Sequence, residues 1–315
     1  MKSKKAILLL NMGGPNNIDE VKVFLNNMFN DKAIIGAPKP IRKMIAFLIT
    51  TLRLKEAKSN YKKLGGKSPI VAYTKNLVKK LAGELDEDVY YVMRYTPPFA
   101  DDVLKDIKDY DKFYLIPMYP HYSSTTTASS LDHIYKSAKK FGIDRSKFVS
   151  LDKYYNNKVY NNSIISRIKE SLADKNANDY ELIFSAHGLP KSIIDKGDVY
   201  QNHIKQNVLT LRKMLLANSI NFNNTHIAYQ SRLGPVEWIK PYLDDKLKEI
   251  SKNTKSKKKV LIYPIAFTID NSETEFELDV EYKEIADELK LEDYQVIKAP
   301  NEMMSDSIKD LYQKM

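Results

Sequence analysis

The chain of 315 residues contains no cysteine. Disulfides, zinc sites with thiolate ligands and iron–sulfur clusters held by cysteine are therefore excluded. No stretch approaches the roughly 20 apolar residues of a membrane-spanning helix. The apolar run near the N-terminus is broken by Asn11 and Gly13, so we interpret it as a first strand and not as a signal peptide. These absences fit a cytoplasmic protein.

Nucleotide-binding motifs are also missing. Two glycine-containing turns, NMGGP and AHGLP, contain neither GxGxxG nor GxxxxGK[ST], which disfavours a dinucleotide or Walker-type site. The net charge of +10 favours acidic partners such as carboxylated small molecules, anionic lipid or nucleic acid. The lysines are spread along the chain, and the densest basic run, residues 252–259, is expected to be a solvated loop. Because no motif interleaves aromatic and basic residues, we expect no nucleic-acid partner.

Apolar runs of strand length alternate with longer segments of helical spacing. The runs are residues 6–10, 89–93, 113–118, 181–184, 226–229, 260–265 and 294–297. The helical segments are residues 21–28, 77–85, 164–172, 204–216 and 282–289. This alternation predicts βαβ units and parallel sheets.

The best-marked stretch is residues 260–282, VLIYPIAFTIDNSETEFELDVEY, an apolar run that ends in acidic residues. Residues 113–135, FYLIPMYPHYSSTTTASSLDHIY, repeat its frame. The pairs that match at one constant offset are Pro117 and Pro264, Thr127 and Thr274, Leu131 and Leu278, Asp132 and Asp279, and Tyr135 and Tyr282. The second copy alone carries Glu273, where the first has Thr126.

A second repeat appears earlier in each half of the chain. ILLLNMGGP at residues 7–15 resembles LIFSAHGLP at residues 182–190. Because the two repeats occur in the same order, we predict a duplicated topology of two similar α/β lobes. We assign residues 1–155 to the first lobe and residues 156–304 to the second, and expect a C-terminal helix at residues 305–315 to pack back on the first lobe.

Residues 34–66 of the first lobe form a distinct segment, in which apolar and basic residues are interspersed. They include Met44, Ile45, Phe47, Leu48, Ile49 and Leu52 beside Arg42, Lys43, Arg53 and Lys55. A basic amphipathic helix is typical of a membrane-surface or partner-binding element. The alternative is a core helix whose lysines extend to solvent.

His187 stands out among the five histidines because it closely follows the apolar run 182–184 and precedes Gly188. That places it at the carboxyl edge of a strand, where ligands bind in doubly wound sheets. Its counterpart in the first lobe is Met12, so one lobe presents a proton acceptor and the other a polarisable thioether. The alternative is that His187 is an ordinary turn residue held by hydrogen bonds. The remaining histidines are His121, which could line a cleft, His133, on a predicted helix, and His203 and His226, which we expect to be structural or exposed.

Glu273, Glu277 and Glu281 follow at i, i+4 and i+8, which would align them along one face of a helix. Acidic and apolar residues also alternate here with a strand period, but helical spacing continues through residues 282–289, so we predict a helix. Imidazole and carboxylate together can bind borderline divalent metals. A ligand set this small suits an ion that arrives and leaves. The residues thus favour a two-lobed α/β protein that handles a transient metal or a proton.

Seven sequence motifs follow one another along the chain. They are LLLNMGGP, NYKKLGGKSPI, YPHYSSTTTASSLDHIY, SAHGLP, GDVYQ, YQSRLGPVEWIKPY and PIAFTIDNSETEFELDVEY. Together they resemble ferrochelatase of the bacterial type over nearly the whole chain.

The resemblance implies two similar Rossmann-like, chelatase-type lobes, each a parallel sheet flanked by helices, with the active-site cleft between them. It implies an enzyme that inserts ferrous iron into protoporphyrin IX to form protohaem (haem b), the terminal step of haem biosynthesis. Iron is then a substrate and no cofactor is needed. The iron–sulfur cluster of some relatives is absent, because this chain has no cysteine.

Individual roles also follow from the resemblance. His187 matches the family's active-site histidine, which accepts pyrrole protons, and Glu273 matches its partner acid, both in contact with the metal. Glu277 and Glu281 match acids of a metal or proton path. The residues in motifs that line or approach the porphyrin are Met12, Tyr61, Ser68, Arg94, Tyr122 and Trp238. Residues 34–66 match the lip of the cleft, which implies peripheral contact with the inner membrane surface.

The chain departs from the family pattern at two positions, and a third position bears on the substrate. Asn271 stands where many relatives have histidine, so no role of that histidine carries over. Val199 replaces a proline in the motif GDVYQ. Some relatives that act on coproporphyrin III carry tyrosine at the position of Met12, so Met12 favours protoporphyrin. The alternatives are a coproporphyrin III ferrochelatase, a chelatase for another divalent metal, and a non-catalytic porphyrin or haem carrier.

Overall fold

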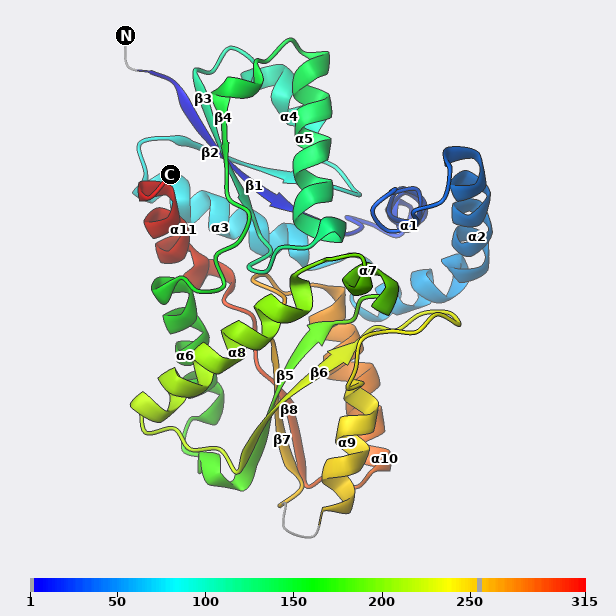
Figure 1. Cartoon of the computed structure of the whole chain (residues 1–315), viewed down its shortest axis with the longest axis vertical. Coiled ribbons are helices and arrows are strands. Elements are labelled where there is room, and N and C mark those ends of the chain that lie inside the picture. The colour runs from blue at the N-terminus through cyan, green and yellow to red at the C-terminus, as the bar shows by residue number, and fades with distance from the viewer. Residues whose placement is uncertain (1–2, 254–256) are drawn as a thin grey trace. The chain divides into compact units, whose positions relative to one another are not determined.

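The structure is a computed structural model that describes residues 3–253 and 257–315. Residues 254–256 of the basic run 252–259 lie outside the described residues. The chain divides into two compact units. Unit 1 comprises Met1–Lys153 and Ser305–Met315, and unit 2 comprises Tyr154–Met304. Each unit is built on one parallel four-stranded sheet (Figure 1).

In unit 1 the strand order is β2-β1-β3-β4. The strands are β1 (Lys5–Asn11), β2 (Asp88–Met93), β3 (Lys112–Pro117) and β4 (Phe148–Ser150). The helices are α1 (Glu20–Phe29), α2 (Lys39–Lys63), α3 (Ile70–Glu84), α4 (Ala100–Ile107), the π-helix η1 (Ser124–Ala128), α5 (Ser129–Lys140) and α11 (Met304–Gln313). Because side chains alternate along a strand, Leu115 packs with α4 and α5, while Tyr114 meets Tyr312 of α11 edge-on at 4.8 Å.

In unit 2 the strand order is β6-β5-β7-β8. The strands are β5 (Tyr180–His187), β6 (Asn224–Gln230), β7 (Lys259–Pro264) and β8 (Asp293–Val296). The helices are α6 (Lys158–Leu172), α7 (Lys191–Asp195), α8 (Tyr200–Ala217), α9 (Leu243–Lys252), the π-helix η4 (Glu273–Glu281) and α10 (Tyr282–Glu288). Leu247 of α9 and Ala286 of α10 belong to the same buried cluster as Ile183 of β5.

The predicted duplication is confirmed by the topology. In both sheets the first strand of the unit stands second in the order. The second strand lies on one side of it, and the third and fourth strands follow on the other side. In both units a strand that ends in proline, at Pro117 or Pro264, is followed by a π-helix and then an α-helix. β1 and β5 are therefore equivalent, and so are the turns that follow them.

The seven predicted strands and the five predicted helical segments are all present. β4 was not predicted, because a strand of three residues, FVS, is too short to form an apolar run. The choice of helix over strand for residues 273–281 is also confirmed, but the helix is of the π type, with i→i+5 hydrogen bonds instead of the expected α type.

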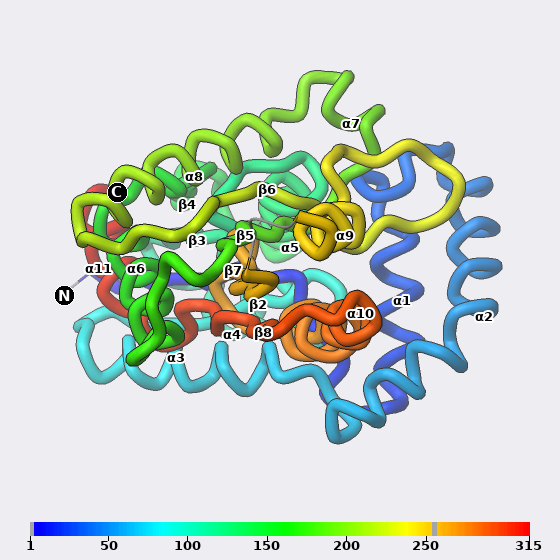
Figure 2. The backbone as a smooth tube through the Cα atoms, turned by 90° about the horizontal axis from the view of Figure 1, so that it is seen from below, coloured from blue at the N-terminus to red at the C-terminus, as the bar shows by residue number. Residues whose placement is uncertain are grey.

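α2 fills most of the segment 34–66 and lies beside α1 (Figure 2). Its buried side chains are Ala46, Thr50 and Tyr61. Its exposed large apolar side chains are Ile41, Met44, Phe47, Leu48 and Leu52. The alternative of a core helix is therefore wrong for most of α2, which presents an apolar face outward. In the described ranges 3–253 and 257–315, no helix combines the length and apolar character needed to cross a membrane.

Candidate active site

His187 is the last residue of β5, an interior strand of its sheet, as the sequence predicts. The chain turns sharply after it. The N–H of Gly188 donates to the carbonyl oxygen of Gln230 at 2.8 Å, and the Tyr200 hydroxyl donates to the carbonyl oxygen of His187 at 3.0 Å. These bonds fix the backbone on either side of the imidazole, which keeps 36% of its side-chain surface exposed.

Glu273 begins η4, after the loop that follows β7. β7 is the neighbour of β5, so both strands deliver their C-terminal residues to the same edge of the sheet. Nδ1 of His187 lies 2.9 Å from Oε2 of Glu273, whose side chain is 21% exposed. The structure thus brings together the histidine and the acid that the sequence singled out.

The Glu273 carboxylate changes the acid–base properties of the histidine. Burial lowers the pKa of His187, but the charge and hydrogen bond of Glu273, with a weaker effect of Glu277, more than offset it and raise the pKa to about 9. An unperturbed imidazole has a pKa of about 6.5 and is largely neutral at pH 7. Beside Glu273, the imidazolium form of His187 is therefore favoured at neutral pH.

Glu277 follows Glu273 on the same helix, η4. Its Oε2 accepts hydrogen bonds from the Ser231 hydroxyl and, at 3.2 Å, from Nε2 of Gln230. Burial and the nearby charge of Glu273 raise the pKa of Glu277 to about 7, although Ser231 and His187 act in the opposite direction. A carboxyl group with this pKa can both take up and release a proton near neutrality.

Glu281 ends η4 and is exposed, whereas Glu277 is half-buried. The three acids therefore run along one helix from the histidine at the sheet edge toward solvent. In the part of the chain that the structure describes, no three histidine, aspartate or glutamate side chains are grouped so as to hold a metal ion.

Trp238 lies at the same turn as His187. It forms an isolated antiparallel bridge with Pro190, and its indole N–H donates to the carbonyl oxygen of Leu233 at 3.0 Å. A Cβ atom added to Gly188 would lie 3.3 Å from the Trp238 ring. Of the six residues expected to approach the porphyrin, Trp238 is the one that shares a unit with His187.

Three of the other five residues are grouped at the NMGGP turn of unit 1. Met12 belongs to this turn, and Tyr61 and Ser68 pack close to it. Met12 follows β1 and packs on the buried cluster that contains Tyr61 of α2. The Ser68 N–H donates to the carbonyl oxygen of Pro15 at 2.7 Å. A Cβ atom added to Gly14 would lie 2.5 Å from the Ser68 hydroxyl, so glycine lets the turn pack against it. Tyr61 and Ser68 are buried, and Met12 is half-buried.

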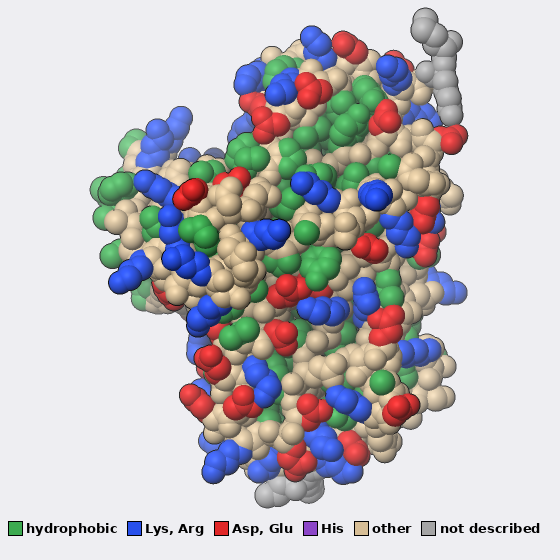
Figure 3. All heavy atoms as spheres, turned by 180° about the vertical axis from the view of Figure 1, so that it is seen from behind, with side chains coloured by type: hydrophobic (Ala, Val, Ile, Leu, Met, Phe, Trp, Pro, Cys, Tyr) green, Lys and Arg blue, Asp and Glu red, His purple; other side chains and the backbone are tan. Residues whose placement is uncertain are grey.

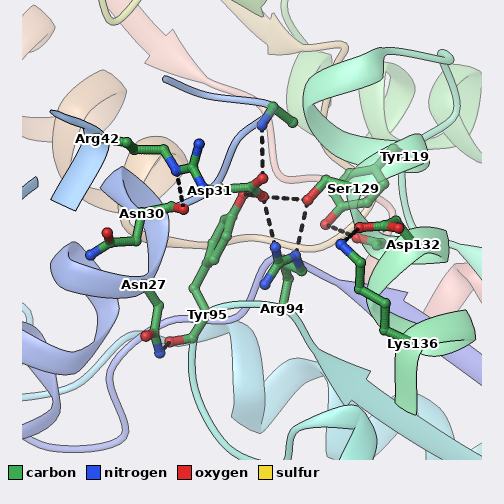
Figure 4. A network of polar contacts seen from close by, with 12 residues as sticks. Asn27, Asn30, Asp31, Arg42, Arg94, Tyr95, Tyr119, Ser129, Asp132 and Lys136 are labelled. Atoms are coloured by element: carbon green, nitrogen blue, oxygen red, sulfur yellow. Dashed lines mark hydrogen bonds and ion pairs between the residues drawn. The ribbon is translucent and has the colours of Figure 1, made fainter. Parts of the chain in front are cut away.

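Arg94 follows β2 and belongs to a polar network (Figure 4). Its Nη2 lies 3.0 Å from Oδ2 of Asp31, and its Nε donates to the Ser129 hydroxyl at 2.9 Å. Asp31 is 6% exposed and also accepts from the Tyr95 hydroxyl at 2.9 Å and from Ser129. Burial, followed by the Asp31 charge, raises the pKa of Tyr95, which keeps this donor protonated.

Tyr122, the last of the six residues expected to approach the porphyrin, is half-buried in the loop before η1.

The other histidines have different surroundings. His226 Nε2 lies 2.8 Å from Oε2 of buried Glu181, and the His203 ring lies 4.6 Å from that of Tyr155. Both side chains are thus held by contacts within unit 2, which agrees with the expectation of a structural or exposed histidine. His133 lies on α5, where burial and the charge of Arg94 lower its pKa to about 4. His121 is buried after β3.

The comparison with known families decides the class of protein. The sequence profile described as Ferrochelatase matches residues 4–313. The chain belongs to the ferrochelatase family. It is therefore an enzyme, a metal chelatase that inserts iron into porphyrin in haem synthesis.

Relatives named ferrochelatase align over nearly the whole chain. The protein of Sulfurimonas denitrificans is 47% identical, covering 99% of this chain and 99% of the relative. The protein of Nitratiruptor sp. is 48% identical over 99% of this chain and 100% of the relative. The protein of Helicobacter pylori strain G27 is 42% identical over 95% of this chain and 89% of the relative.

Solved chelatase structures share the fold. SirB from Bacillus subtilis with Fe³⁺ aligns with a TM-score of 0.58 at 9% identity, over 99% of this chain and 95% of that one. CbiX, described as the terminal enzyme for siroheme biosynthesis in denitrifying bacteria, aligns with a TM-score of 0.51 at 9% identity, over 98% and 99%. The predicted fold of two similar chelatase-type α/β lobes is confirmed.

Several residues that shape the site gave no signal in the sequence. Ser231 and Gln230 hold Glu277, and Tyr200 holds the His187 backbone. Asp31 organises Arg94 from the loop after α1. Ser231 and Gln230 do lie in the motif YQSRLGP, but their partners depend on the neighbouring strand and cannot be deduced from spacing.

Proposed function

We propose that the chain inserts ferrous iron into protoporphyrin IX to form protohaem, as the terminal step of haem biosynthesis, and that His187 and Glu273 carry the chemistry. The supporting observation is the 2.9 Å contact between His187 Nδ1 and Glu273 Oε2 at the carboxyl edge of the sheet. The contact joins a proton carrier to a carboxylate that can contact a divalent cation.

Metallation must remove two N–H protons from the macrocycle. His187 can accept one only after it has lost its own, because its pKa is raised to about 9. A divalent cation that approaches Glu273 opposes a positive charge on the adjacent imidazolium and so lowers the pKa of His187. Arrival of iron therefore prepares His187 to take a pyrrole proton.

Glu277 and Glu281 form the path that serves this pair. The pKa of Glu277, about 7, suits uptake and release of protons at neutral pH. Glu281 lies at the exposed end of η4. We assign to these acids the passage of protons or iron between the His187–Glu273 pair and solvent. No bound cofactor is needed for this chemistry.

The porphyrin is held by apolar and aromatic side chains in this proposal. Met12 offers a thioether to the ring, and it stands where some relatives that act on coproporphyrin III carry tyrosine, which favours protoporphyrin. Trp238 contributes an aromatic surface beside the His187 turn. The remaining four assigned residues are Tyr61, Ser68, Arg94 and Tyr122. Because Tyr61 and Ser68 are buried, they support the binding surface, while Arg94 acts from the position that Asp31 imposes.

We also propose a cytoplasmic protein that touches the inner membrane surface through α2. The helix exposes Phe47 by 67% and Leu52 by 80%. Figure 3 shows hydrophobic and basic side chains mixed where α2 lies, at the left of the view. Beside this face, a hollow of about 420 Å³ is lined by Asn26, Asn30, Lys39, Arg42 and Lys43. Exposed apolar side chains interspersed with cations suit a surface of anionic lipid.

The test is metal insertion by the purified chain and its variants His187→Ala and Glu273→Gln, with protoporphyrin IX and coproporphyrin III as substrates. We expect insertion of Fe²⁺ into protoporphyrin IX, a kcat reduced on the order of 100- to 10,000-fold by His187→Ala, and porphyrin binding retained in both variants. Equal turnover in all three proteins would refute the site. Preference for coproporphyrin would refute the substrate, and binding without insertion in the wild type would indicate a carrier.

A further inference from the structure

Asn271 lies just before η4, and its side chain is hydrogen-bonded to the local backbone. Asn271 is 4% exposed. Its Oδ1 accepts the N–H of Glu273 at 2.8 Å, and its Nδ2 donates to the carbonyl oxygen of Ile269 at 3.2 Å. An asparagine that binds the N–H two residues later forms an Asx turn, which satisfies a donor left unpaired at a helix start.

Thr274 completes the turn from the other side. The N–H of Asn271 donates to Oγ1 of Thr274 at 3.0 Å, and the N–H of Glu275 donates to the carbonyl oxygen of Asn271 at 2.9 Å. The first turn of η4 is thus held by reciprocal bonds, as in a capping box. Glu273 lies inside this closed turn.

Asp270, the residue before the turn, is fully buried and anchors the turn to the rest of unit 2. Oδ2 of Asp270 accepts from Nδ2 of Asn301 at 2.6 Å, and the N–H of Asp270 donates to Oδ1 of Asn301 at 2.9 Å. Oδ1 of Asp270 accepts the N–H of Ala299 at 3.1 Å. The backbone at Asn271 is therefore fixed to the segment after β8.

We infer that Asn271 is a positioning residue, which aims the Glu273 carboxylate at His187 by capping the first turn of η4 and neither contacts iron nor exchanges protons. The carboxamide has no titrating proton, and both of its ends are used by the backbone. Loss of the cap frees the Glu273 N–H and lets its side chain drift from the 2.9 Å contact. A displacement of about 1 Å can cost on the order of 100-fold in rate.

The test uses the full chain and a double-mutant cycle. Asn271→Ala is expected to lower kcat for metal insertion by about 10- to 100-fold, with the KM for porphyrin within about twofold. Asn271→Ser keeps an uncharged oxygen acceptor that can bind the Glu273 N–H as a serine turn does, so it should recover part of the lost kcat. In a Glu273→Gln background, Asn271→Ala should lower kcat no further, because the two changes act through one side chain.

Asn157 provides a matched control in the same unit. It is also a buried capping asparagine, and its Oδ1 accepts the N–H of Tyr160 at 2.9 Å at the start of α6. Asn157→Ala should lower the melting temperature to a similar degree without changing kcat. If Asn271→Ala and Asn157→Ala affect kcat equally, or if Asn271→Ser is as slow as Asn271→Ala, the positioning role is refuted.

The inference rests on the proposed function for the role of Glu273, so a readout without catalysis is needed. Amide hydrogen exchange should be faster across residues 272–277 in Asn271→Ala, and unchanged there in Asn157→Ala. If exchange rises as expected while Glu273→Gln has full activity, the proposed function fails and the cap stands. If exchange does not rise, the cap itself is refuted.

Discussion

Nδ1 of His187 and Oε2 of Glu273 lie 2.9 Å apart, although 86 residues separate them in the chain. The contact follows from topology, since His187 ends β5 and Glu273 follows β7, its parallel neighbour. The equivalent positions of unit 1 are Met12 and Thr126, which cannot form such a pair. Duplication of one fold thus gave two similar units with an acid–base pair in the second.

The first prediction concerns the charge state of that pair. In Glu273→Gln, the pKa of His187 should fall from about 9 toward or below its ordinary 6.5, because burial still acts and the main carboxylate is gone. Histidine C2 hydrogen exchange followed by mass spectrometry measures this pKa in a peptide that contains His187. A midpoint that stays near 9 would contradict the assignment of the shift to Glu273.

The same pair has a consequence for stability. Since the folded-state pKa of His187 is raised, its pairing stabilises the fold fully below about pH 6.5 and loses this effect as the pH rises through about 9. Glu273→Gln should remove that dependence. Glu275→Gln is the control, because Glu275 lies on the same helix but pairs with Lys298 at 3.2 Å.

Much of this arrangement could be predicted from the sequence. Apolar runs of strand length, alternating with helical periods, gave the order of elements. The matched prolines Pro117 and Pro264 revealed the repeat, and parallel strands bring their C-terminal ends together. The pattern placed His187 and Glu273 after strands of the second lobe as candidate ligands, and the resemblance to ferrochelatase implied that they are partners.

The rest depends on tertiary contacts that carry no local signal. Acids at i and i+4 fit an α-helix as well as a π-helix, so the type of η4 could not be deduced. The pKa of His187 depends on a single distance. The role of Asp31 depends on which strand end lies beside its loop. Arg94 was singled out through the resemblance to the family, but nothing in the sequence pointed to its partner Asp31.

A second prediction tests the turn after His187. A Cβ atom on Gly188 would lie 2.8 Å from the backbone oxygen of Gln230, which cannot move without disturbing β6. Gly188→Ala should therefore destabilise the protein by about 1–3 kcal/mol and lower metal insertion, as judged by urea unfolding and the insertion assay. Gly83→Ala on α3 has open space around its Cβ and should not destabilise the protein. Equal effects of the two substitutions would contradict the steric argument.

A third prediction concerns the network around Asp31. Asp31→Ala leaves Arg94, with its side chain 20% exposed, without its carboxylate partner and removes the acceptor of the Tyr95 hydroxyl. The free energy of unfolding should fall by about 3 kcal/mol, because a largely buried charge then lacks its partner. Asp19→Ala is the control, since Asp19 is fully exposed and lies 4.0 Å from Lys58. A loss below about 1 kcal/mol in Asp31→Ala would show that the network contributes little to stability.

The last prediction concerns the outward apolar face of α2. Phe47→Ser combined with Leu52→Ser should weaken binding to vesicles of anionic phospholipid, because these two side chains are the most exposed large apolar groups of the helix. Sedimentation with vesicles measures the bound fraction, and metal insertion into a detergent-dispersed porphyrin should stay within about twofold if the fold is intact. Binding of the wild type should also decrease as salt is raised, because part of it is electrostatic.

The control for α2 is Leu216→Ser on α8, where an apolar side chain is 65% exposed without a comparable apolar row beside it. This change should leave vesicle binding unaltered. Neutral phosphatidylcholine vesicles separate the two contributions, since apolar insertion alone should give weaker binding that does not depend on salt. If the wild type binds neither kind of vesicle, α2 is not a membrane-contacting surface, and its exposed apolar face must be explained by a protein partner.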